Sequence, residues 1–198
     1  MITKKCFDVY YLLVSEGSAE YRLFSYLTTN KFRGLFSESS IKFSDKVEIV
    51  EVGVSRGKLN SAGNIGDFKT KYELIREKYK GQKRFFMLDK DLNDSSKIEK
   101  LIKQNGDIIQ FLEYNTEHLL LKFSRKNPKN PSDFYNILGN FRDYCKKEFK
   151  KQFNKKASDF KDVDFDSVFK DVKDKDIKNA FAELFSTLSW FTNSSSRK

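Results

Sequence analysis

Residues 7–20 read FDVYYLLVSEGSAE, a nearly continuous apolar stretch that stops at a glutamate and a glycine. An apolar run of this length without alternation predicts a strand covered on both faces of a sheet. Ser18 can then cap a helix, with Glu20 in its first turn, where a carboxylate is favoured. Apolar residues recur beyond it at helical spacing. The stretch therefore predicts a buried strand, a tight turn and a helix.

The same pattern of strand and helix repeats along the chain. Further strands are predicted at 47–54, 84–88 and 108–112, and helices between them at 67–80 and 95–103. Strands that alternate with helices through short turns predict an α/β fold with an open, mostly parallel four-stranded sheet. Right-handed crossovers would place helices on both faces. We expect residues 1–125 to form this domain and residues 126–198 to form a helical C-terminal extension packed on it.

The expected C-terminal extension is rich in aromatic and charged residues. Residues 132–156 carry apolar side chains at helical spacing and predict a long helix or a helix pair. Residues 162–176 are rich in Asp and Lys, so we expect them to be loosely structured. Residues 177–191 predict a final helix.

The charge of the chain favours a polyanionic partner. The net charge is +10, with 38 Lys or Arg against 28 Asp or Glu, although an AT-rich genome explains this total equally well. Residues 122–156 alone hold eleven Lys or Arg against three Asp or Glu, which predicts a surface that faces nucleic acid. The predicted contacts to the substrate are Arg56, Lys58, Lys90, His118, Lys146, Lys147, Lys150 and Lys151.

Several classes of site and location are excluded by composition. Two cysteines, Cys6 and Cys145, and a single histidine without Cys-x-x-Cys spacing exclude an ordinary structural zinc site. The apolar runs are too short to span a membrane, so we expect a soluble cytoplasmic protein. No Walker A motif occurs, so any ATPase that works with this protein would be a separate chain.

Acidic residues follow three of the predicted strands. Glu16 follows the first strand, Asp89 and Asp91 follow the third, and Glu117 comes after the fourth. The carboxyl ends of parallel strands meet at one edge of a sheet, where ligands bind. Carboxylates that converge there repel one another unless a cation joins them, and Mg²⁺ prefers their oxygen atoms. Each residue alone also fits a loop or a first helical turn, so the combination predicts the Mg²⁺ site, with Mn²⁺ as a substitute.

The spacing of these motifs resembles the Toprim family of topoisomerases, primases and overcoming-lysogenization-defect (OLD) nucleases. The matching residues are 14–20, where a strand is followed by Glu-Gly-x-x-Glu, and 87–91, where a strand is followed by Asp-x-Asp. The resemblance covers roughly residues 7–123. It implies Glu16 as the general acid or base. It further implies that the Mg²⁺ ligands are Asp89 and Asp91, with Glu20 as an additional ligand.

A narrower resemblance concerns residues 115–123, NTEHLLLKF. They look similar to a segment of the RloB-like stand-alone Toprim proteins of bacterial defence loci, although Thr116 stands where those chains have an aromatic residue. The resemblance implies a nuclease in anti-phage defence, with Glu117 as a further metal ligand. A separate ABC-type or other ATPase subunit is the partner that it suggests.

The leading hypothesis is a metal-dependent endonuclease that cleaves DNA or RNA. One alternative is a non-catalytic Toprim-like subunit that binds nucleic acid or an ATPase. The other is a different phosphoryl-transfer enzyme on an unrelated doubly wound fold. Such folds usually carry an aspartate at the end of the first strand, where this chain has Glu16 and Gly17.

Overall fold

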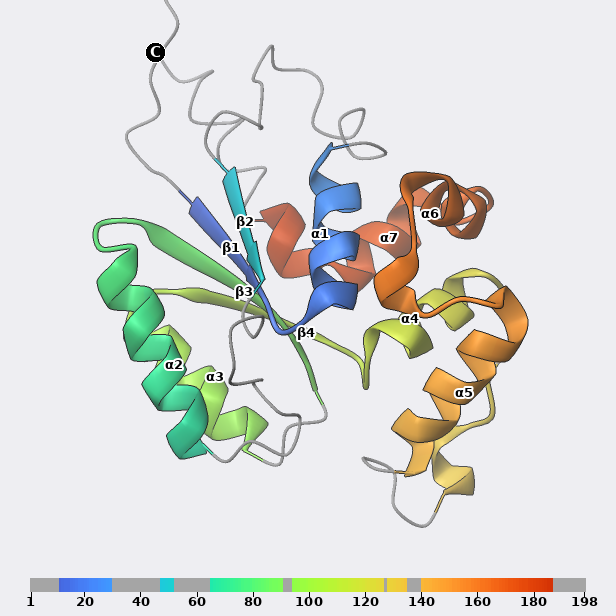
Figure 1. The fold of residues 1–198 in the computed structure, drawn as a ribbon, viewed down its shortest axis with the longest axis horizontal. Coiled ribbons are helices and arrows are strands. Elements are labelled where there is room, and N and C mark those ends of the chain that lie inside the picture. Colours follow the sequence, from blue (N-terminus) through green and yellow to red (C-terminus); the bar gives the residue numbers. More distant parts are fainter. Residues whose placement is uncertain are drawn as a thin grey trace, which may run out of the picture.

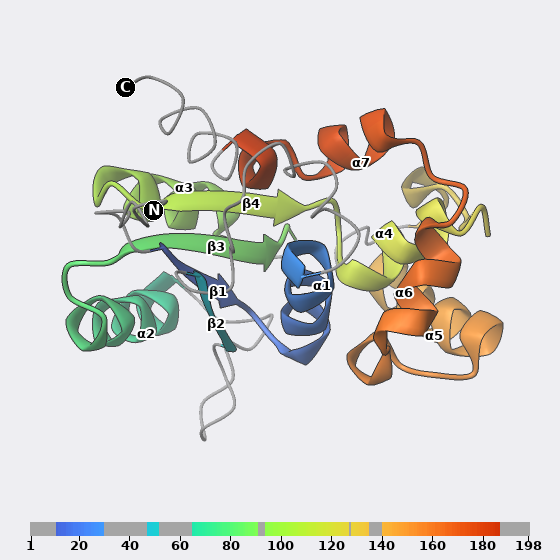
Figure 2. The same ribbon diagram turned by 90° about the horizontal axis from the view of Figure 1, so that it is seen from above.

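The protein has a parallel β-sheet with helices on both faces (Figures 1 and 2). The structure, a computed structural model, describes residues 11–29, 47–51, 65–90, 94–126, 128–134 and 140–186. The α/β class and the parallel sheet flanked by helices, as predicted, are confirmed. No helix in the described ranges is long and apolar enough to cross a bilayer.

The strands lie in the order β2-β1-β3-β4, and every neighbouring pair is parallel. Their bounds are β1 (Tyr11–Ser15), β2 (Val47–Glu51), β3 (Lys83–Asp89) and β4 (Ile108–Leu112). Ser15 is in register with Met87, and Asp89 is in register with Leu112. The carboxyl ends of β1, β3 and β4 therefore lie at one edge of the sheet.

The helices between the strands divide between the two faces. They are α1 (Ser18–Thr29), α2 (Ile65–Lys78) and α3 (Ser95–Gln104). The first crossover runs from β1 out to β2, and the next two run the opposite way, from β2 to β3 and on to β4. With right-handed crossovers this reversal puts α1 on one face and α2 and α3 on the other, as Figure 2 shows. It also creates a topological switch point between β1 and β3, where ligands bind in such sheets.

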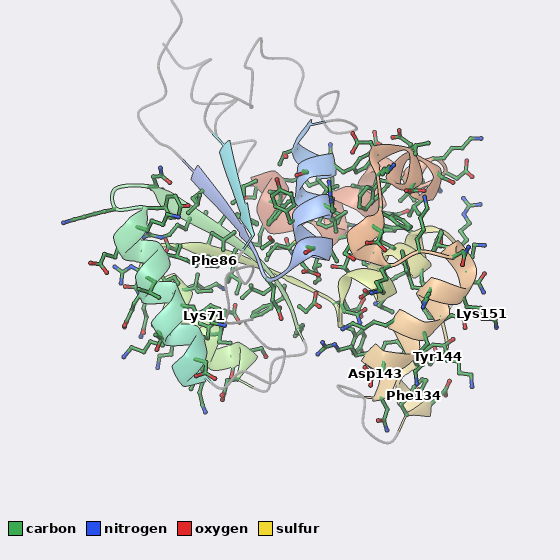
Figure 3. All side chains as sticks on the ribbon, in the orientation of Figure 1. Lys71, Phe86, Phe134, Asp143, Tyr144 and Lys151 are labelled. Atoms are coloured by element: carbon green, nitrogen blue, oxygen red, sulfur yellow. The ribbon has the colours of Figure 1, made fainter. Side chains whose placement is uncertain are left out.

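Side chains alternate between the two faces along β1, β3 and β4, with the period of two that strands impose. Leu13, Phe85 and Met87 join the core on the α1 side. Phe86, labelled in Figure 3, joins the core on the other side, where its ring lies 5.4 Å from that of Tyr72 in α2. Both faces are buried, which explains why the strands read as continuous apolar runs.

The C-terminal helices enlarge the core on the α1 side. They are α4 (Thr116–Phe123), α5 (Arg142–Phe153), α6 (Asp162–Phe169) and α7 (Asp174–Ala180), with 3₁₀ turns at Pro131–Asp133 and Ala157–Asp159. Phe149, Phe165 and Phe181 belong to the same buried cluster as Phe24 and Phe85 of the sheet region. A single core cluster therefore includes side chains from both regions expected from the sequence.

One prediction for the C-terminal part was wrong. The segment 162–176, expected to be loosely structured, contains α6 and the start of α7. Of the long helix or helix pair expected over 132–156, the described residues contain the 3₁₀ turn at Pro131–Asp133 and α5, and residues 135–139 lie outside them.

The helix α6 is stabilised by tertiary contacts that the Asp- and Lys-rich composition of its segment does not reveal. Phe165, Val168 and Phe169 are buried at helical spacing beneath the charged residues. The ring of Tyr26 in α1 stacks on Phe165 at 4.9 Å, and its hydroxyl donates a hydrogen bond to Asp166 at 2.7 Å. Aromatic pairs of this kind add to the stability that burial supplies.

Candidate active site

Glu16 and Asp89 lie next to each other across the switch point. Glu16 directly follows β1, and Asp89 is the last residue of β3, the neighbouring strand. The carboxylate oxygen Oε2 of Glu16 accepts a hydrogen bond from the backbone N–H of Asp89 at 3.2 Å. Asp89 is only 8% exposed. The structure thus brings together two of the acidic residues singled out in the sequence.

A third carboxylate, Glu20, projects from the first turn of α1 and is 6% exposed. Its Oε1 accepts a hydrogen bond from the Thr116 hydroxyl at 2.5 Å. Its Oε2 lies 3.2 Å from the position that a Cβ on Gly17 would occupy, a spacing tighter than ordinary van der Waals contact. A side chain at position 17 would therefore require this carboxylate to shift by a few tenths of an ångström.

The amino end of α4 is fixed by its cap, Asn115. The Asn115 Oδ1 accepts a hydrogen bond from the backbone N–H of His118 at 2.8 Å. Its Nδ2 donates to the backbone oxygen of Arg142 in α5 at 3.4 Å. The cap orients the first turn of α4, which carries Thr116 and Glu117, and joins it to α5. Since Thr116 also bonds to Glu20, helices α1, α4 and α5 meet at this edge of the sheet.

Burial and nearby positive charges shift the pKa of two carboxyl groups at this edge, Glu20 and Glu117, in opposite directions. Burial raises the pKa of Glu20, while the Thr116 hydrogen bond and the charge of Lys146 lower it. Burial also raises the pKa of Glu117, which Lys146 and Arg142 lower and the charge of Glu20 raises further. The two carboxyl groups are thus close enough to repel each other. A proton or a cation is favoured between such groups.

The predicted lysine contacts that the structure describes lie in α5 and in the turn after β3. Lys90 is exposed directly after Asp89. In α5, Lys146, Lys147, Lys150 and Lys151 are all exposed, and Lys151 forms an ion pair with Glu148 at 3.9 Å. Figure 3 labels Lys151 toward the end of α5 that lies away from the sheet and Asp143 in its first turn.

His118 is a buried histidine in an aromatic cluster. Its Nδ1 lies 3.2 Å from the backbone oxygen of Glu113. Its ring packs edge-on against Tyr114 at 5.1 Å and against Phe141 at 5.4 Å. Burial lowers the pKa of His118, so the neutral imidazole is favoured. These contacts are those of a packed histidine in the core.

The donor set at this edge suits a hard divalent cation. Glu16 and Asp89 supply carboxylate oxygens, and Mg²⁺ needs only one or two carboxylates because it keeps several waters. Within the described residues, no group of three or more His, Cys, Asp or Glu side chains is arranged to hold a metal ion. Asp91, Arg56 and Lys58 lie outside the described residues. The suitability of this edge for Mg²⁺ therefore rests on the ligand chemistry of carboxylates and on the contact between Glu16 and Asp89.

Two residues at this edge were missed by the sequence analysis. Thr116 was treated only as a departure from a family pattern, yet it is the hydrogen-bond donor to Glu20. Arg142 stands four residues before Lys146 in α5 and influences the pKa of Glu117. The four-residue spacing of Arg142 and Lys146 was the available signal, because such residues lie on the same side of a helix.

A scan of protein-family models and searches of curated proteins and of solved structures gave no match to this chain. The function is therefore argued from the site itself.

Proposed function

We propose that this protein is a Toprim-like, Mg²⁺-dependent endonuclease that hydrolyses phosphodiester bonds of DNA or RNA. The observation that supports it best is the contact of Glu16 with Asp89 at the switch point of a parallel sheet. Glu20 and Glu117 stand at the same edge, beside the basic helix α5. Carboxylates that gather at a binding edge, next to cations that attract a polyanion, suit cleavage of a phosphate ester.

Each residue has a defined task in this proposal. Asp89, with Asp91 two residues later, would hold the ion, which would supply Lewis-acid activation of the phosphodiester and of water. The backbone N–H of Asp89 orients the carboxylate of Glu16, which takes the proton from the attacking water. Thr116 fixes the carboxylate of Glu20 through its hydroxyl. The positive charges of Arg142 and Lys146 offset the repulsion between the substrate phosphate and the buried carboxylates.

A non-catalytic subunit that binds nucleic acid, or a separate ATPase chain, is the second candidate. It is favoured by the four exposed lysines of α5. A cationic helix alone is sufficient for binding to a polyanion. The two candidates differ in whether Asp89 is required for a chemical step.

The test is cleavage of plasmid DNA and of total tRNA by wild type, Asp89→Asn and Asp143→Asn. Each substrate is incubated with Mg²⁺, Mn²⁺ or EDTA. We expect wild type to cut one of the substrates with either metal and not with EDTA. Asp89→Asn should lower the rate by more than about 100-fold, since loss of even an outer partner of a metal site costs 10–100-fold. Asp143 is exposed in the first turn of α5, so Asp143→Asn should retain full activity.

Two outcomes would contradict the proposal. Metal-dependent cutting that survives Asp89→Asn would move the catalytic centre away from the switch point. Binding of nucleic acid without cutting in any metal would support the non-catalytic subunit instead.

A further inference from the structure

The basic side chains of α5 fall into two rows along the helix. Residues four apart lie nearly in line on a helix surface, about 6 Å apart along its axis. The inner row consists of Arg142, Lys146 and Lys150, and the outer row consists of Lys147 and Lys151.

The packing of α5 gives the two rows different orientations. Phe141, Cys145 and Phe149 form the fully buried stripe of the helix. Each inner-row residue follows one of these by a single position, so it is rotated by about 100° from the stripe. Lys147 and Lys151 follow Cys145 and Phe149 by two positions, which is about 200° of rotation. The inner row therefore flanks the buried face, and the outer row points away from it.

The inner row begins at the acidic edge of the sheet. The backbone oxygen of Arg142, its first member, accepts the hydrogen bond from Asn115 Nδ2 at 3.4 Å. Asn115 caps α4 two positions before Glu117.

The electrostatics agree with this geometry. The charge of Lys146 lowers the pKa of both Glu20 and Glu117, and that of Arg142 lowers the pKa of Glu117. In the outer row, Lys151 is instead paired with Glu148 of its own helix. The charges of Arg142 and Lys146, the first two members of the inner row, thus act at the acidic edge.

We propose that the inner row, and not the outer row, holds the sugar–phosphate backbone of one substrate strand beside the acidic edge. This inference rests on the proposed function, because it names the path by which the substrate reaches that site. Carboxylates at the edge repel a phosphodiester, so a strand approaches only where cations stand beside them. Because its members recur about every 6 Å along the helix axis, the inner row presents a line of positive charge to the phosphates of one strand.

The test compares two double variants that remove the same charge from the same helix. Lys146→Gln with Lys150→Gln alters the inner row, and Lys147→Gln with Lys151→Gln alters the outer row. All four lysines are exposed, so neither pair removes a buried side chain. Fluorescence anisotropy of labelled single-stranded DNA and RNA, in EDTA and at several salt concentrations, measures binding by the full chain.

We expect the inner-row variant to bind about 10-fold more weakly, and the slope of log affinity against log salt to fall by about 1.4, since each phosphate contact on a single strand contributes about 0.7. The outer-row variant should keep nearly the wild-type affinity and slope. Lys146→Arg retains the charge and should recover about half of the lost slope when it replaces Lys146→Gln in the inner-row variant, since Lys150→Gln remains.

Equal losses in the two variants would overturn the inference, because binding would then depend on total charge alone. A lowered melting temperature in the inner-row variant, with binding equal to that of the outer-row variant, would also overturn it. That result would assign Lys146 to neutralising Glu20 and Glu117 only. The proposed function fails separately, because the binding assay contains no metal and detects binding whether or not the protein cuts. Inner-row binding in this assay, together with no cleavage in the Mg²⁺ and Mn²⁺ assay, would contradict the nuclease and leave the inner row as the binding surface.

Discussion

The two ends of the sheet hold buried carboxylates in opposite settings. At the amino end, Asp107 stands before β4 with its side chain 2% exposed. Its Oδ2 accepts hydrogen bonds from Arg84 Nε at 2.8 Å and from the Tyr72 hydroxyl at 2.6 Å, and its Oδ1 accepts one from the Arg84 backbone N–H at 3.3 Å. At the carboxyl end, burial raises the pKa of both Glu20 and Glu117.

The difference separates a structural carboxylate from a candidate functional one. At the amino end a single carboxylate meets a matched cation and several donors, which is how a buried charge is tolerated. At the carboxyl end several carboxylates converge on one edge and disfavour each other's charge. Proteins accept such a local cost at sites that bind or react. The comparison predicts that substitutions at the amino end lower stability and that those at the carboxyl end lower activity.

The largest expected effect is on stability at the amino end. Asp107→Ala leaves the Arg84 guanidinium buried without its partner, so the free energy of unfolding should fall by about 3–5 kcal/mol. Urea denaturation measures this loss. Asp143→Ala, at an exposed position, should change the same quantity by less than about 0.5 kcal/mol. A similar small change for both would show that the amino-end network contributes little.

The next effect is on activity at the carboxyl end. Glu16→Gln keeps an acceptor for the Asp89 N–H but removes the proton-transfer group. Cleavage should slow by more than about 100-fold, as is typical for loss of a general acid or base. The free energy of unfolding should change by less than about 1 kcal/mol. Glu73→Gln, on the exposed side of α2, is the activity control. Loss of stability that parallels loss of activity would erase the contrast between the two ends.

A smaller effect is expected at the hydrogen bond between Thr116 and Glu20. Thr116→Val removes a buried hydrogen-bond donor and leaves the Glu20 carboxylate without this bond. The free energy of unfolding should therefore fall by about 1–3 kcal/mol. Thr116→Ser keeps the hydroxyl and should retain more of that stability. Urea denaturation of both variants in EDTA distinguishes them. Equal losses would assign the role of Thr116 to packing of its methyl group.

The smallest effect concerns pH. Burial raises the pKa of Glu20, so the folded chain binds this proton more tightly than the unfolded chain does. The stability from protonation is complete below the ordinary pKa of 4.5 and is lost as pH rises through the raised value. Wild type should therefore lose stability relative to Glu20→Gln as pH rises through this window, measured in EDTA from about pH 4 to about pH 8. Parallel curves for the two proteins would contradict the raised pKa.

The strands of the sheet were predictable because both of their faces are buried. The expected strand at 108–112 matches β4, and the one at 84–88 matches β3 with one residue added at each end. Continuous apolar runs bounded by Asp and Gly are local signals that need no distant contact. The helices of the C-terminal part were less predictable, since α6 is ordered by the packing of Phe165 and Phe169 against Tyr26 of α1.

The amino acid sequence by itself determined that Glu16 and Asp89 stand at the ends of two buried strands, because apolar runs and the charged residues that end them are local patterns. Only the tertiary structure decided that these strands are neighbours and which partners surround the two carboxylates. Thr116 meets Glu20 across 96 residues of chain, a pairing that no local pattern encodes. The orientation of Lys146 toward the acidic edge, and of Lys147 away from it, depends on which stripe of α5 is buried against the core. Long-range packing therefore determines how the carboxylates of this edge are paired, and so which chemistry they can support.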